Sequence, residues 1–211
     1  MPNDLSAHLV KGLLSLGLQV TQEQQNSLLN FVALLVKWNR VYNLTAVREA
    51  DQMLSRHILD SLSILPYLKG PRIIDVGSGP GLPGIPLAIV KPDFQFVLLD
   101  SNRKKTRFMQ QAKTELHLGN VKVECVRAEN FHPVESFDSV ISRAFASLSQ
   151  IVACSSHFCR ENTALLAMKG AVSETEFAEL PKSFEIKAVH KLDYPGLDAD
   201  RYLVEMKVSN S

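Results

Sequence analysis

The sequence lacks several features that would assign it to a specialised class of protein. It has only three cysteines, Cys125, Cys154 and Cys159, with no C-x-x-C pair, so neither a disulfide framework nor a zinc site is indicated. No apolar run approaches the roughly 20 residues that a membrane-spanning helix needs. The start, "MPNDLSAHLV", lacks the charged and then apolar order of a secretory signal. We therefore expect a cytoplasmic protein with no membrane segment and no bound metal.

The chain also lacks a strong net charge, which is +1 over 211 residues, but its charges are unevenly distributed. Residues 31–127 carry 14 Lys and Arg against 8 Asp and Glu, whereas residues 128–211 carry 8 against 12. One part of the surface is therefore expected to be basic enough to meet a polyanion. A mixed, solvated surface is the alternative that charge alone leaves open.

The sequence divides near residue 70 into two parts. Before it, residues 21–44 carry apolar side chains at three- and four-residue spacing, which predicts an amphipathic helix. A second helical stretch is expected over residues 49–65, where it ends before a proline. We predict a helical extension over residues 1–70, packed on a core domain that spans residues 71–211.

After residue 70, short strand-like runs alternate with segments of helical composition. The runs are "RIIDVG", "FQFVLLD", "VKVECVRAE", "FDSVISRAF" and "NTALLAMKG". This alternation predicts a mostly parallel α/β sheet with crossover helices. The ending differs, because "FEIKAVHKL" and "RYLVEMKV" follow each other without a helix between them. We expect these two strands to form an antiparallel pair at one edge of the sheet.

The stretch "IIDVGSGPGLPGIPLAIV", at residues 73–90, joins the first strand to a helix through a loop rich in glycine and proline. Gly79 to Gly84 fits G-x-G-x-x-G, and Asp100 lies about twenty residues further on, at the end of the second strand. In an open α/β sheet such a loop lies at the carboxyl ends of the strands, where ligands bind. The motif alone leaves open a nicotinamide-dependent oxidoreductase and an adenosine-binding methyltransferase.

Two prolines favour the second of these alternatives. Pro83 and Pro86 remove N–H donors from the first helical turn, where a dinucleotide's pyrophosphate would bind. A ligand without phosphate, such as S-adenosylmethionine, fits this turn better. Asp75 would attract a sulfonium or amino group, unless it is a buried acid that accepts bonds from the loop's own N–H groups. Asp100 can accept hydrogen bonds from both hydroxyls of a ribose.

Five longer motifs occur in order along the chain: "WNRVYNLTAVRE" at 38–49, "RHILDSL" at 56–62, "IDVGSGPGLPGIPLAI" at 74–89, "LLDS" at 98–101 and "VISRAFASL" at 140–148. Together they resemble the glucose-inhibited division protein B family, the bacterial 16S ribosomal RNA guanine-N7 methyltransferases. The resemblance covers nearly the whole chain and implies a Rossmann-like class I methyltransferase sheet. It also implies S-adenosylmethionine as cofactor, and 16S ribosomal RNA or the small ribosomal subunit as partner.

The resemblance implies which residues bind the cofactor. Asp75, Gly77, Gly79 and Leu82 would line its methionine and sugar side. Asp100 would bind its ribose.

Four further residues are placed by the resemblance near the adenine and the substrate. Ala128 and Glu129 would flank the adenine. Arg143, after the fourth strand, would face both cofactor and substrate, with Lys169 beside it at the end of the fifth strand. We predict that both cations position the substrate, although salt bridges of ordinary strand-end cations are the alternative.

A basic cluster, "NRKKTR" at 102–107, opens the helix after the second strand. Arg103, Lys104, Lys105 and Arg107 would lie at the rim where RNA arrives, so we expect them to contact phosphates. A solvated helix face is the alternative, in which case basic residues of the N-terminal helices would bind the RNA.

Two other functional classes remain open at this point. His57, Asp60 and Ser61 share a helical face, as a hydrolase triad would, but the serine lacks the strained turn that exposes a nucleophile. A hydrogen-bond cluster that packs the N-terminal part against the sheet is the preferred interpretation. A non-enzymatic RNA-binding module that keeps the fold is the remaining alternative.

Overall fold

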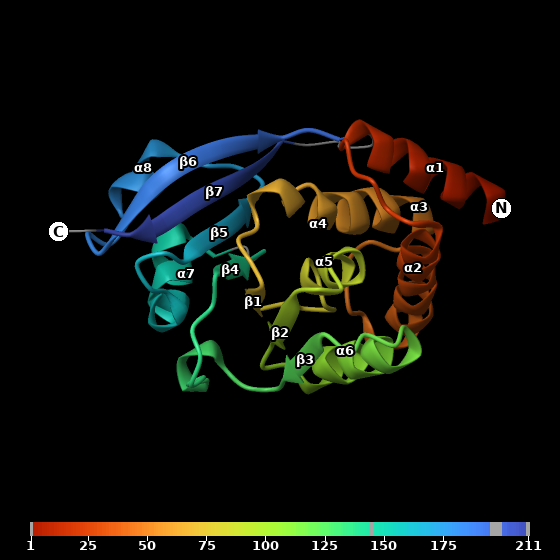
Figure 1. The fold of residues 1–211 in the computed structure, drawn as a ribbon, viewed down its shortest axis with the longest axis horizontal. Helices are drawn as coiled ribbons and strands as arrows, with labels where there is room; N and C mark the ends of the chain where they lie inside the picture. The colour runs from red at the N-terminus through yellow and green to blue at the C-terminus, as the bar shows by residue number, and fades with distance from the viewer. Residues whose placement is uncertain (1, 144–145, 195–199, 210–211) are drawn as a thin grey trace.

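The computed structural model describes residues 2–143, 146–194 and 200–209. Within them, seven strands form one sheet in the order β3-β2-β1-β4-β5-β7-β6 (Figure 1). The strands are β1 (Arg72–Val76), β2 (Gln95–Leu99), β3 (Val121–Glu124), β4 (Ser139–Ser142), β5 (Ala164–Lys169), β6 (Phe184–Leu192) and β7 (Arg201–Val208).

The sheet has the predicted direction of its strands. β1 to β5 are parallel, β7 runs antiparallel to β5, and β6 pairs antiparallel with β7 at the edge. The mostly parallel α/β fold with an antiparallel C-terminal pair is therefore confirmed. The last two residues of the run "FDSVISRAF", 144 and 145, lie outside the described part of the chain.

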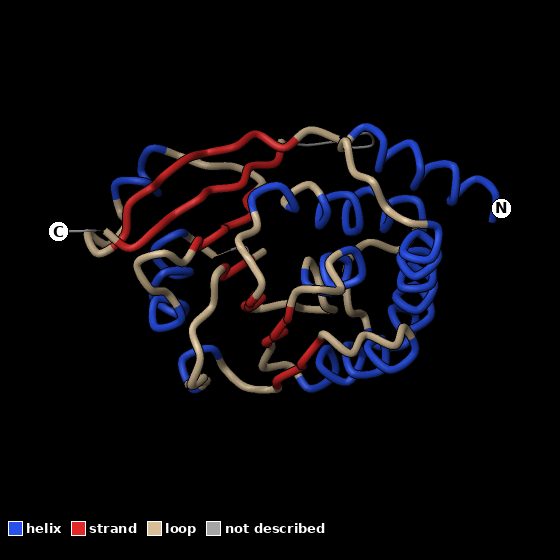
Figure 2. Tube along the Cα trace, viewed as in Figure 1, coloured by secondary structure: helices blue, strands red, loops and turns tan. Residues whose placement is uncertain are grey.

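Helices cover both faces of the sheet (Figure 2). On one face, α5 (Gly84–Val90) and α6 (Arg103–Glu115) contribute to a core that includes Ile73 of β1. On the other face, α7 (Leu148–Ser155), α8 (Glu174–Ala178) and the 3-10 turn η4 (Ser156–Phe158) pack over Ile74. Neighbouring residues of one strand thus enter opposite cores, because successive side chains of a strand point to opposite faces.

The N-terminal part is helical, as predicted, but its second helical stretch is not one regular helix. The elements are α1 (Pro2–Ser15), α2 (Gln22–Tyr42), α3 (Ala50–Met53), the π-helical turn η1 (Leu54–Leu59), α4 (Asp60–Leu62) and the 3-10 turn η2 (Leu65–Tyr67). The π-helical turn widens the helix just before Asp60, in the "RHILDSL" motif.

Helix α2 packs on the outside of α5 and α6 and shares their core. Phe31 is fully buried, and its ring centroid lies 6.0 Å from that of Phe108 in α6. The side-chain amide of Gln24 donates to the carbonyls of Ile89 (3.2 Å) and Val90 (3.3 Å), the last residues of α5. A domain boundary near residue 70 stays a prediction, because the first hydrophobic core runs through both parts of the chain. In the described residues, no helix combines the length and the apolar character that crossing a membrane requires.

We predict that the N-terminal helices and the sheet unfold as one cooperative unit. Phe31→Ala should cost about 3–5 kcal/mol of unfolding free energy, because it leaves a cavity between α2 and α6. Val41→Ala, at an exposed position of the same helix (70% exposed), should cost less than about 0.5 kcal/mol. Urea unfolding followed by circular dichroism measures both. A separate early transition in the Phe31→Ala protein would contradict a shared core.

Candidate functional site

The loop between β1 and α5 turns sharply at glycines. Gly77, Gly79 and Gly81 have φ values of +74°, +58° and +84°, in the left-handed region that side chains disfavour. A Cβ added at Gly77 would have no neighbour within 4 Å, and one at Gly79 would meet only the ammonium of Lys105, at 4.0 Å. The backbone therefore borders open space at Gly77, whereas Gly79 is buried and faces the ammonium of Lys105. The side chain of Leu82 is buried in the first core, and its expected place beside the cofactor stays a prediction.

Hydrogen bonds fix this loop to the end of β2. The backbone N–H groups of Gly77 and Ser78 both donate to the carbonyl of Leu99, at 2.8 and 3.0 Å. The Ser78 hydroxyl donates to the carbonyl of Asp75 (2.8 Å) and accepts from the N–H of Leu99 (3.1 Å). The loop is therefore already shaped in the protein alone, a state that favours ligand binding.

Asp75 lies completely buried at the end of β1, under the loop. Its Oδ2 accepts from the N–H of Gly84 at 2.9 Å, so the expected alternative, a bond to the loop's own backbone, does occur. Its Oδ1 is buried and has no hydrogen-bond partner. Burial raises the pKa of Asp75 to about 7, and the Gly84 N–H and the charge of Arg143 oppose that rise. A buried acceptor without a partner is uncommon, and it is satisfied when a ligand supplies a donor.

The first turn of α5 has the predicted shortage of donors. Pro83 is the N-cap residue and Pro86 lies in the first turn, so neither offers an N–H group. Gly84 is needed for packing, because a Cβ there would lie 2.1 Å from Leu98 and 2.8 Å from Asp75 Oδ2. Its N–H points to Asp75, which leaves this turn poorly suited to a phosphate.

Asp100 follows β2 and stands beside the glycine loop. Its Oδ2 accepts from the N–H of Gly79 at 2.9 Å, and its Oδ1 accepts from the N–H of Asn102 at 2.8 Å. Each carboxylate oxygen can accept a further bond. Asp100 thus supports the loop and keeps acceptor capacity for a ligand's hydroxyls.

Ala128 and Glu129 lie further from β3 than the sequence pattern suggests. β3 ends at Glu124, and the two residues stand in a 3-10 turn, η3 (Ala128–Asn130). Ala128 packs against the second core, while Glu129 is exposed. Their contact with an adenine stays a prediction.

The two expected substrate-positioning cations both carry ion pairs. Lys169, the last residue of β5, donates to Glu176 Oε1 at 2.6 Å and to the carbonyl of Ala146 at 2.7 Å. Arg143, directly after β4, donates through Nη1 to Asp60 Oδ2 at 3.1 Å and to the carbonyl of Arg56 at 3.3 Å. Both side chains are thereby held in place at the carboxyl edge of the sheet.

The contacts of Arg143 settle the arrangement of His57, Asp60 and Ser61. All three are buried, and the Ser61 hydroxyl donates to the carbonyl of His57 rather than to its ring. The ring Nε2 of His57 contacts the Thr45 hydroxyl at 2.9 Å. Burial lowers the pKa of His57 to about 4, and the charge of Arg143 adds to the effect. The three side chains do not form a hydrolase triad; they pack the N-terminal segment against the sheet.

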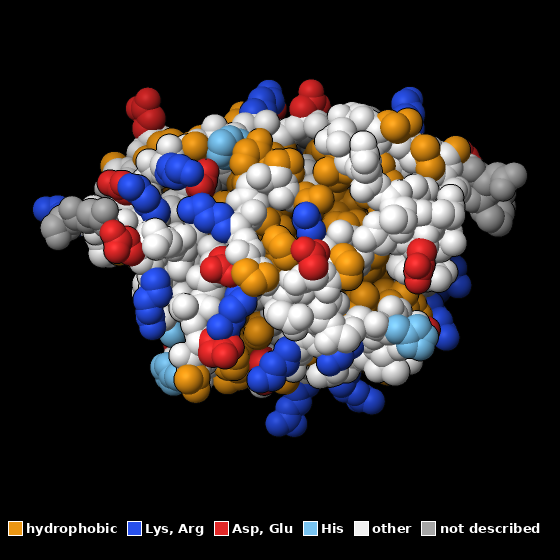
Figure 3. All heavy atoms as spheres, viewed as in Figure 1, with side chains coloured by type: hydrophobic (Ala, Val, Ile, Leu, Met, Phe, Trp, Pro, Cys, Tyr) orange, Lys and Arg blue, Asp and Glu red, His pale blue; other side chains and the backbone are white. Residues whose placement is uncertain are grey.

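The basic cluster lies on α6, with one member turned to the loop. Arg103, Lys104 and Arg107 are exposed, whereas Lys105 is half-buried and its ammonium faces Gly79. Lys and Arg side chains gather along the lower edge of the surface in Figure 3, where Figure 1 places α6 and β3.

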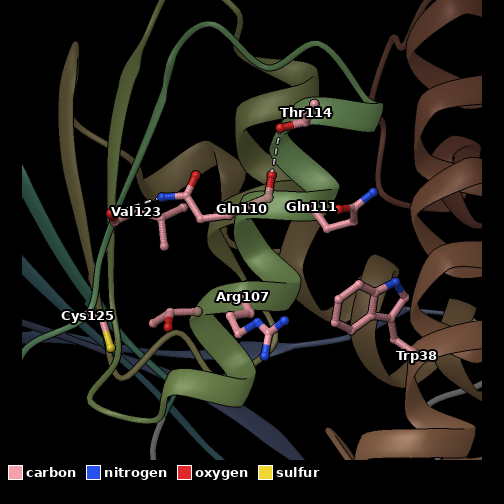
Figure 4. Close-up of a pocket in the computed structure, with 8 residues that line it drawn as sticks. Trp38, Arg107, Gln110, Gln111, Thr114, Val123 and Cys125 are labelled. Carbon is pink, nitrogen blue, oxygen red and sulfur yellow. Dashed lines mark hydrogen bonds between the residues drawn. The ribbon is translucent and has the colours of Figure 1, made fainter.

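A groove of about 370 Å³ runs over the outer face of α6, away from the glycine loop. Figure 4 shows Arg107 in its middle, between Trp38 of α2 and Cys125 after β3. The side-chain amide of Gln110 donates a hydrogen bond to the carbonyl of Val123 in β3. Because residues of both α6 and α2 line the groove, the basic helix α6 and the N-terminal helix α2 are neighbours. These helices belong to the two basic regions that the sequence offers as alternatives for RNA binding.

Comparison with known proteins agrees with this geometry. Residues 24–204 match the family model of rRNA small subunit methyltransferase G. Proteins named ribosomal RNA small subunit methyltransferase G from Nitrosococcus oceani and Shewanella amazonensis are 52% and 50% identical, over 94% and 96% of this chain and 93% and 98% of theirs.

Solved structures share the fold at low identity. Ribosomal protein L11 methylase from Lactobacillus delbrueckii subsp. bulgaricus superposes with a TM-score of 0.54 at 14% identity, over 74% of this chain and 79% of that one. P. horikoshii TYW2, solved in complex with MeSAdo, superposes with a TM-score of 0.57 at 10% identity, over 74% and 63%. With its seven-stranded sheet, its glycine loop and relatives at about half identity, the chain belongs to the rRNA small subunit methyltransferase G family.

Proposed function

We propose that this protein methylates N7 of a specific guanine in 16S ribosomal RNA, with S-adenosylmethionine as methyl donor. The RNA would be met in the cytoplasm, either free or within the small ribosomal subunit. The observation that carries the proposal is the loop after β1, where the backbone borders open space at Gly77 and the buried Oδ1 of Asp75, at the end of β1, has no hydrogen-bond partner. The names of the relatives supply the substrate class.

The residues of this loop fit S-adenosylmethionine better than a dinucleotide. The molecule carries a cationic sulfonium and an amino group, and Asp75 offers a buried acceptor that has no partner. A cation bound there would favour the ionised form of Asp75 and so oppose the burial that raises its pKa to about 7. The first turn of α5 is short of N–H donors because of Pro83 and Pro86, so it would hold a pyrophosphate poorly. The ribose hydroxyls would bind Asp100, and Ala128 and Glu129 would flank the adenine.

The proposed reaction explains why the site needs no general base. Guanine N7 has a lone pair and no proton to lose, so methyl transfer depends on alignment rather than on proton removal. When bound, the cofactor supplies the electrophilic methyl group. Arg143 presents a planar fork of donors that suits a guanine O6 or a phosphate, and Lys169 adds a second charge at the same edge. The target base would come from a loop or a splayed segment, because stacked RNA hides N7 in a deep groove.

The direct test is transfer of a tritiated methyl group to small-subunit RNA that lacks the modification, followed by mapping of the labelled base. The proposal expects label at N7 of a single guanine. Label at an exocyclic amine, or on protein, would refute it.

We predict that Asp100→Ala weakens S-adenosylmethionine binding at least about tenfold, because each charge-assisted bond to a ribose hydroxyl contributes roughly 1.5–3 kcal/mol. Calorimetry measures the affinity, and circular dichroism verifies the fold. Asp93→Ala, an exposed carboxylate in the turn before β2, is the matched control and should bind normally. Normal affinity in a folded Asp100→Ala protein would remove this residue from the site.

Arg143→Ala should reduce single-turnover methyl transfer about 100-fold, because a misplaced substrate loses alignment. The measurement uses saturating S-adenosylmethionine and a temperature at which the variant is fully folded. Arg160→Ala, an exposed arginine that follows η4, should react at the wild-type rate. Wild-type turnover of Arg143→Ala would show that the guanine is held elsewhere.

Alanine at both Arg103 and Arg107 should flatten the log–log salt dependence of RNA binding by about 1.4, because each phosphate that is neutralised on a single strand steepens that dependence by roughly 0.7. The affinity for S-adenosylmethionine should stay unchanged. Alanine at Lys182, which precedes the edge strand β6, and at Lys207, in the neighbouring strand β7, controls for net charge. An equal change in both double variants would mean that α6 has no special part in binding.

A further inference from the structure

Asp60 is a buried carboxylate for which the proposed reaction has no direct use. Its side chain is 3% exposed, at the point where the π-helical turn passes into α4. Three distant parts of the chain converge on it: Arg143 after β4, Arg201 at the start of β7, and Tyr194 after β6.

The two oxygens of Asp60 have different partners. Oδ2 faces Arg143 Nη1 at 3.1 Å, while Oδ1 accepts from the Tyr194 hydroxyl at 3.0 Å and lies 3.6 Å from Arg201 Nε. Burial and the charge of Asp60 both raise the pKa of Tyr194, so its hydroxyl remains a donor. Both oxygens of the buried carboxylate therefore have hydrogen-bond partners.

Arg143 is fixed by this cluster on one side only. Within the described residues, the hydrogen bonds of its guanidinium all involve Nη1, which binds Asp60 and the carbonyl of Arg56. Its side chain remains 21% exposed, and its charge opposes the rise that burial causes in the pKa of Asp75 under the glycine loop. The guanidinium is therefore held by the buried Asp60 through Nη1, and among the described residues Nε and Nη2 are left as donors for other groups.

We propose that Asp60 is a positioning residue for methyl transfer: it holds the guanidinium of Arg143 in the orientation that aligns the substrate. The inference rests on the proposed role of Arg143. A long, flexible arginine side chain loses alignment when nothing holds its head, and a buried carboxylate on a separate element supplies a fixed point. The N-terminal segment then contributes to the reaction through Arg143 without touching the substrate.

A double-mutant cycle on single-turnover methyl transfer tests this. Asp60→Asn keeps the shape of the side chain and removes its charge, and we expect a rate about 10- to 100-fold lower with unchanged S-adenosylmethionine affinity. In an Arg143→Ala background, Asp60→Asn should lower the rate by less than about threefold, because residues that act through one another are not additive. A purely structural role would instead lower the thermal midpoint and leave the rate of the folded protein unchanged.

Glu205→Gln is the matched control. Glu205 is also a largely buried carboxylate with two side-chain partners, the ammonium of Lys187 and the ring of His190, but it lies in the middle of β7. Its substitution should leave the rate unchanged. If Asp60→Asn does not fold, Asp60→Glu, which keeps the charge and shifts it by one methylene, takes its place in the cycle with the same expectation.

The outcomes separate the two claims. A wild-type rate for the folded Asp60 variant beside an impaired Arg143→Ala protein overturns the inference and leaves the role of Arg143 intact. The inference is also overturned if the rate reductions of the two single variants multiply in full in the double variant, because Asp60 would then act independently of Arg143. A wild-type rate for Arg143→Ala removes the proposed role of Arg143, and with it the basis of the inference.

Discussion

The buried carboxylate of Asp75 is the constraint on which the ligand site depends. It closes the loop after β1 by accepting the N–H of Gly84 across nine residues of sequence, and Gly84 must lack a side chain for the two to approach. The loop between them has few conformations left once Ser78 is bonded to the end of β2. The other oxygen of Asp75, Oδ1, has no hydrogen-bond partner. The arrangement that shapes the loop therefore also leaves one buried acceptor that a ligand's donor can satisfy.

Around this point the site is built at one edge of the sheet. Asp100 and Arg143 follow β2 and β4, and Lys169 ends β5; parallel strands bring their carboxyl ends to the same edge. The residues proposed to bind the cofactor are acidic side chains with free acceptor capacity. Those proposed to position the substrate are cations that are held by buried or half-buried carboxylates. The proposed reaction uses this division, because a cationic cofactor and an anionic RNA need opposite charges.

The sequence was sufficient to predict the sheet and the loop, because their signals are local. Strand periodicity, the glycine spacing and the two prolines are each patterns of a few consecutive residues, and each determines the structure of those same residues. The partners of Asp60 could not be found in this way, since Arg143 and Tyr194 stand 83 and 134 residues away. The π-helical turn was missed because its residues fit an ordinary helical pattern, and the burial of Leu82 was missed because it depends on how the loop folds back onto the core.

The central physical claim is that the loop after β1 accepts a cationic ligand without phosphate. Titration calorimetry of the unmodified protein with S-adenosylmethionine and, separately, with NADH tests it most directly. The account predicts saturable binding of one S-adenosylmethionine per chain and no measurable binding of NADH. Saturable binding of NADH at this site, competing with S-adenosylmethionine or replacing it, would contradict the account.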